Sequence, residues 1–119
     1  MSDHFIGKPT ELREAFDGFV ELARGCGPVT VYAQKTRIVI QARVRFAGAV
    51  VRNHWLDASI WLKRRAEHAR LMRIEDFGHL GFGHHFRLAG RGDIEDALAR
   101  LMREGYRIGE QEDICGKSA

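Results

Sequence analysis

The sequence predicts an α+β domain, with an antiparallel β-sheet of about five strands and an N-terminal and a C-terminal helix packed on one face. Apolar residues recur at helical spacing near both ends of the chain. Between these ends apolar and polar residues alternate, which is typical of strands with one buried and one solvated face. The order of elements contains no alternating βαβ units, so a parallel sheet is not expected.

An apolar stripe at steps of three and four residues predicts the first helix over residues 10–24. We expect Thr10 to be its N-cap, because a threonine hydroxyl can accept a hydrogen bond from the first helical turn. The second helix is predicted over residues 94–109, with Asp93 as its N-cap. A polar tail follows from Gln111.

Strands are predicted at residues 29–33, 37–46, 56–63, 70–77 and 84–89. The run 37–46 is interpreted as either one long strand or two strands with a bend near Gln41. We expect breaks at Gly48, at the corner 52–54 and at the glycine-containing loop 78–83.

The length of 119 residues predicts a single domain over residues 1–119. No apolar stretch approaches the roughly 20 residues that cross a bilayer, and the first residues do not resemble a secretory signal. The two cysteines, Cys26 and Cys115, form neither a CxxC motif nor a disulfide framework. We therefore expect a cytoplasmic protein that does not enter a membrane.

The charge of the chain is unevenly distributed. From Lys35 to Arg91 the sequence has 12 basic and 4 acidic residues, a net charge of +8, whereas the remainder carries −5. Both predicted helices must bury an apolar stripe, so we expect them to cover the same face of the sheet. The other face, called the open face below, is then expected to be basic and to carry the function.

Strand alternation assigns seven candidate ligand-binding residues to the open face: Arg37, Arg43, Arg45, Trp61, Lys63, His85 and Arg87. The arginines and the lysine would supply positive charge and the tryptophan a stacking surface. The pattern favours a non-enzymatic binding or interaction module that recognises an anionic ligand or an acidic partner.

Two other uses of the open face remain possible at this point. Arginines beside an exposed Trp61 could bind nucleic acid, although outward basic residues also keep a sheet soluble. The same face could instead form a homodimer, with Val39 and Trp61 buried between subunits.

Histidines give the third alternative, a small enzyme using His79, His84 or His85 near the loop 79–85. Adjacent strand residues point to opposite faces, so His84 and His85 cannot easily bind one ion, and His84 shares the alternation of the core residues. No metal site, cofactor or catalytic residue is predicted. The glycines of the loop 78–83 are interpreted as a flexible hairpin, because no helix follows to bind a phosphate.

Six short motifs resemble a known family: residues 4–9, 35–38, 62–65, 84–88, 93–98 and 104–106. Over nearly its whole length the chain is similar to the bacterial family called domain of unknown function 5655. The resemblance implies a small α+β domain without an assigned activity. Some members are attached to nuclease-like domains, which adds weight to the nucleic-acid alternative, and the resemblance brings no catalytic residues.

Overall fold

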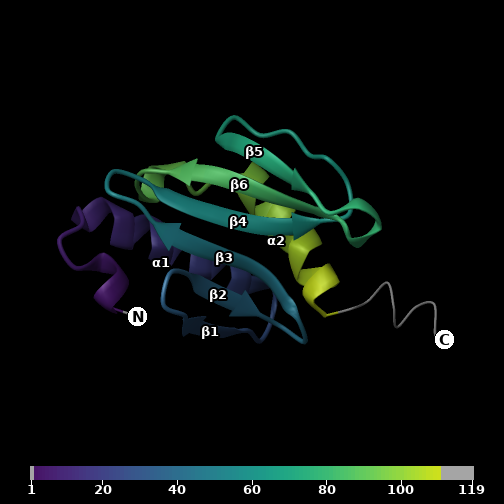
Figure 1. Cartoon of the computed structure of the whole chain (residues 1–119), viewed down its shortest axis with the longest axis horizontal. Helices are drawn as coiled ribbons and strands as arrows, with labels where there is room; N and C mark the ends of the chain where they lie inside the picture. The colour runs from purple at the N-terminus through teal and green to yellow at the C-terminus, as the bar shows by residue number, and fades with distance from the viewer. Residues whose placement is uncertain (1, 111–119) are drawn as a thin grey trace.

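The computed structural model, which describes residues 2–110, contains a six-stranded antiparallel sheet with two α-helices on one face (Figure 1). The helices are α1 (Thr10–Cys26) and α2 (Asp96–Gly109). The strands are β1 (Thr30–Ala33), β2 (Ile38–Gln41), β3 (Arg45–Val51), β4 (Leu56–Leu62), β5 (Leu71–Asp76) and β6 (Phe82–Leu88). Three 3₁₀ turns, η1 (Ser2–Phe5), η2 (Gly78–Leu80) and η3 (Arg91–Asp93), complete the elements. The predicted α+β class is confirmed, and the predicted tail with Cys115 lies outside the described residues.

The strands lie in the order β1-β2-β3-β4-β6-β5, so β6 is inserted between β4 and β5. Figure 1 shows both helices behind this sheet, with the open face toward the viewer. The sheet has six strands rather than about five, because the run 37–46 divides at residues 42–44 into β2 and β3. Backbone N–H groups of Arg43 and Val44 each donate to the Gly109 carbonyl at 2.9 Å, which ties this turn to the end of α2.

The sequence predicted a break at Gly48, and this prediction is wrong. Gly48 lies inside β3. It pairs with Val39 of β2 and Ser59 of β4. A Cβ atom at Gly48 would lie 2.8 Å from the carbonyl oxygen of Ile38. Glycine is therefore present because the neighbouring backbone approaches closely, which is a common reason for glycine in a strand.

Both predicted N-caps are wrong. The extended conformation of Pro9 leads directly into α1, so Thr10 is already the first helical residue, and no described side chain caps the helix. In α2 the capping residue is Glu95, whose carboxylate accepts from the N–H of Leu98 at 2.9 Å. Asp93 belongs to η3 instead, and its carboxylate accepts from the N–H of Ala89 at 2.7 Å.

The core lies between the helices and the covered face of the sheet. Its fully buried strand residues include Ile38, Ile60 and Phe86, and α2 approaches β4 closely because Gly105 has no side chain. A Cβ atom at Gly105 would lie 2.6 Å from the Cγ2 atom of Ile60. Among the described residues no helix is long and apolar enough to cross a membrane.

We expect Gly48→Ala to lower the free energy of unfolding by about 1–3 kcal/mol, because the added methyl group meets backbone that cannot move aside. Gly25→Ala is the matched control, since a Cβ atom at this position of α1 has no neighbour within 4 Å. That variant should be neutral or slightly stabilising, as alanine favours the helix. Urea unfolding of both proteins measures the difference, and equal effects would contradict the packing argument.

Candidate functional site

The centre of the open face holds a buried carboxylate paired with a histidine. Asp57 of β4 is 4% exposed and His85 of β6 is 8% exposed. The Nδ1 atom of His85 lies 2.9 Å from Oδ1 of Asp57, and its Nε2 atom contacts Oε1 of Glu75 on β5. One imidazole ring therefore joins carboxylates from the two strands that flank β6.

These contacts favour the protonated imidazole. The hydrogen bond with Asp57 is the main cause that raises the pKa of His85 above its ordinary value. Burial of the ring acts in the opposite direction, and the contact with Glu75 adds to the increase. The charged form of His85 is thus stabilised by a carboxylate on each side of the ring.

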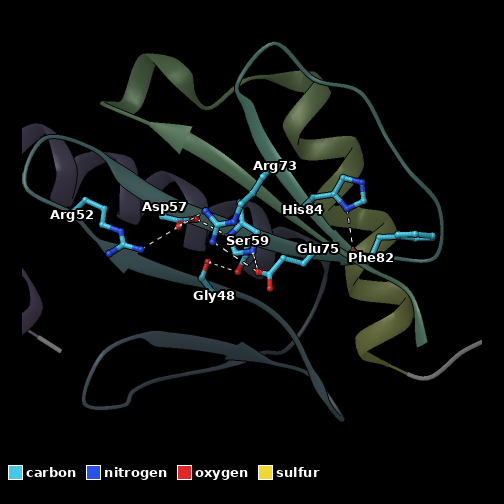
Figure 2. Close-up of polar contacts among 9 residues, drawn as sticks. Gly48, Arg52, Asp57, Ser59, Arg73, Glu75, Phe82 and His84 are labelled. Atoms are coloured by element: carbon cyan, nitrogen blue, oxygen red, sulfur yellow. Dashed lines mark hydrogen bonds and ion pairs between the residues drawn. The ribbon is translucent and has the colours of Figure 1, made fainter. Parts of the chain in front are cut away.

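Two exposed arginines surround the carboxylates. The side chains of Arg52, Asp57, Arg73 and Glu75 gather within one part of the sheet (Figure 2). Arg52 and Arg73 each approach Oδ2 of Asp57 at 3.8 Å, and Arg73 lies 3.9 Å from Glu75. Each long contact to an exposed guanidinium group contributes little free energy. His85 is therefore the principal partner of Asp57.

Beside this cluster the open face is hollowed into a groove of about 510 Å³. The groove, as the term is used here, reaches from the open face to Ile108 of α2. Its lining residues are Arg37, Val44, Arg45, Phe46, Ala47, Ser59, Ile60, Trp61, Lys63, Glu75, Phe77, Leu80, Gly83, His85 and Ile108. Its apolar wall combines Val44, between β2 and β3, with the segment after β5, where the Phe77 ring stacks on Trp61 at a centroid distance of 4.9 Å. The indole N–H of Trp61 donates to the Leu80 carbonyl at 3.0 Å, which fixes this segment against β4.

Five of the seven predicted ligand-binding residues line the groove: Arg37, Arg45, Trp61, Lys63 and His85. Arg43 lies outside it, in the turn bonded to the end of α2. Arg87 also lies outside, with its guanidinium 4.5 Å from the centroid of the Trp55 ring. Trp61 is half-buried rather than exposed, because Phe77 covers one face of its ring.

The sequence prediction omitted the two carboxylates, Asp57 and Glu75. Asp57 shares the strand alternation of Trp61, so its position on the open face was readable from the sequence. Glu75 reaches His85 only because β5 pairs with β6. The homodimer alternative expected Val39 to be buried between two subunits. Val39 is already buried within one chain, at 3% exposure, so a second subunit is not needed to cover it.

His84 faces the core, as its alternation predicted, and is fully buried. Its Nε2 atom accepts from the N–H of Ala66 at 2.9 Å, and Nδ1 donates to the carbonyl of Phe82 at 3.1 Å. Burial lowers the pKa of His84 below its ordinary value. The ring is neutral and structural, and within residues 2–110 no group of three or more histidine, cysteine or acidic residues is placed to hold a metal ion.

We expect the pKa of His85 to lie above the ordinary histidine pKa of about 6.5 and that of His84 to lie below it. The stabilisation from charged His85 is complete below that value and is lost as the pH rises through its raised folded-state pKa. The stabilisation from neutral His84 is present above that value and is lost as the pH falls through its lowered folded-state pKa.

NMR titration of the ring resonances measures both pKa values, and Asp57→Asn should lower the pKa of His85 while leaving that of His84 unchanged. Equal pKa values for the two histidines in the unmodified protein would contradict this description of the site.

Comparison with known proteins agrees with the whole-chain resemblance. The model of the family named domain of unknown function (DUF5655) matches residues 1–109. No curated protein and no solved structure matches the chain. Since the match extends over more than half of the 119 residues, the chain belongs to the DUF5655 family.

Proposed function

We propose that this chain is a non-enzymatic binding module whose groove holds a small organic anion with an apolar part. The observation that carries the proposal is the combination, in one groove, of exposed cations and an exposed apolar wall. The proposal narrows the open-face interpretation made from the sequence to the part of that face that is concave.

The cations are available to a ligand. Arg37 and Arg45 are exposed, and within the described chain no carboxylate lies within ion-pairing distance of either. The ammonium group of Lys63 donates to the Leu80 carbonyl at 3.3 Å, a neutral partner that leaves its charge uncompensated. Positive groups around a concave site raise the local concentration of anions, and guanidinium groups bind carboxylate and phosphate with two parallel hydrogen bonds.

The apolar wall and the volume support a ligand of limited size. Val44, Phe77 and Leu80 are 37%, 44% and 56% exposed, large values for apolar side chains, and all three line the groove. A volume of about 510 Å³ lies within the range of roughly 300–1,000 Å³ found for small-molecule sites. A compact ligand would cover these side chains and gain the free energy of removing them from water.

Nucleic acid is the less favoured occupant. One face of the Trp61 ring is already stacked on Phe77, and Asp57 and Glu75 add negative charge to the middle strands of the open face. Both features oppose base stacking and phosphate binding on the middle strands.

We place the binding activity in the cytoplasm, and the two widely spaced cysteines support a reducing compartment.

Titration with 8-anilinonaphthalene-1-sulfonate, a fused aromatic anion, tests the proposal. We expect saturable binding with quenching of Trp61 fluorescence, and binding weakened about tenfold or more in Arg45→Glu, since the reversal replaces attraction by repulsion. Arg43→Glu is the matched control, because it makes the same charge change two residues away and outside the groove, and its effect should be much smaller.

N-phenyl-1-naphthylamine, which has the same rings without the sulfonate, should bind more weakly than the anion. Equal loss in the two arginine variants would contradict the assignment of the groove. Tight, salt-dependent binding of an oligothymidine that excludes the sulfonate would instead favour the nucleic-acid alternative.

A further inference from the structure

The contact between Glu75 and His85 leads to a more specific inference, which rests on the proposed function. We propose that the Glu75 carboxylate occupies the anion position of the groove, and that the ligand's anionic group replaces it on Nε2 of His85. Glu75 then acts as an internal competitor, and His85 is the residue that recognises the ligand's carboxylate, sulfonate or phosphate oxygen.

The position of the His85 ring is fixed from one side. Its Nδ1 atom is hydrogen-bonded to Asp57, a side chain that is only 4% exposed. With Nδ1 held there, Nε2 must point toward β5 and the groove. A ligand therefore meets a donor whose direction is already set, which lowers the entropic cost of binding.

The contact on Nε2 is the one that can be exchanged. The Glu75 side chain is 46% exposed and belongs to β5, the strand at the edge of the sheet. When its carboxylate leaves His85 it can return to water or approach Arg73, from which it is already only 3.9 Å away. If the ligand instead displaced Asp57 from Nδ1 of His85, the buried carboxylate would lose its partner, which costs far more free energy.

The charges around His85 favour such an exchange. On the sheet it faces Asp57 of β4 and Arg73 and Glu75 of β5, while Arg52 lies beside Asp57. The groove adds the cations Arg37, Arg45 and Lys63. With a ligand anion on Nε2, the imidazolium still has two negative neighbours, Asp57 and the ligand. The ligand also brings negative charge into the groove that holds the uncompensated cations, which Glu75 does not neutralise.

A different role for Glu75 makes different predictions. If the carboxylate served only to hold the fold, its neutralisation would lower stability and leave ligand affinity unchanged. If it contributed directly to binding, its neutralisation would weaken affinity. The internal-competitor proposal requires that affinity increase when the charge of Glu75 is removed. Because loss of a negative charge that lines the groove would by itself also favour an anion, the proposal further requires that the ligand contact Nε2 of His85.

The test compares Glu75→Gln with Glu67→Gln, an exposed acid in the segment between β4 and β5 whose substitution changes the net charge equally. The probe is 8-anilinonaphthalene-1-sulfonate at constant ionic strength, measured by titration calorimetry. We expect about tenfold tighter binding to Glu75→Gln, the scale of one charge-assisted hydrogen bond that no longer competes, and less than a twofold change in Glu67→Gln. Unchanged or weaker binding to Glu75→Gln would overturn the proposal.

A second measurement uses the unmodified protein, so that it does not depend on the folding of a variant. Addition of the same probe should shift the ¹⁵N resonance of His85 Nε2 and leave Nδ1 nearly unchanged. Saturable binding of the probe without a shift at Nε2 would overturn the proposed exchange on His85, but not the proposal that the groove binds organic anions. If neither the unmodified protein nor Glu75→Gln binds the probe, the proposed function fails together with this inference.

Discussion

The hydrogen bond between Asp57 and His85 is the interaction on which the open face depends. A carboxylate that is 4% exposed needs a partner, and among residues 2–110 only His85, across the β4–β6 pair, provides a close one. Breaking a buried pair of this kind costs about 3–5 kcal/mol, because the remaining charge stays in a poorly hydrated place. The bond also orients the imidazole, so that its second nitrogen meets Glu75 and borders the groove.

The adjacent histidines show how strand alternation separates two chemistries. His84 points into the core, where both ring nitrogens are satisfied by backbone groups and burial keeps the ring neutral. His85, one residue further, points to the open face, where the hydrogen bond with Asp57 raises the pKa of its ring. A slip of one residue in the pairing of β6 would exchange the two environments and leave a charge in the core, so these side chains also help to specify the register.

Periodicity was enough to predict the class of fold, the two helices and the face on which Arg45, Trp61 and His85 meet. It could not predict strand order, because neighbours in sequence need not be neighbours in a sheet. The insertion of β6 between β4 and β5 brings Glu75 to His85, and that pairing depends on the whole sheet. The position of Arg43 outside the groove could not be predicted for a similar reason, since its turn is bonded to the distant end of α2.

The most direct test of the exchange is a crystal structure of the protein with 8-anilinonaphthalene-1-sulfonate bound. Our account predicts a sulfonate oxygen within hydrogen-bonding distance of His85 Nε2, with the rings against Phe77 and Leu80. It also predicts that Glu75 is turned toward solvent while the Asp57 contact is kept. A sulfonate bound elsewhere, with Glu75 still on His85, would contradict the account.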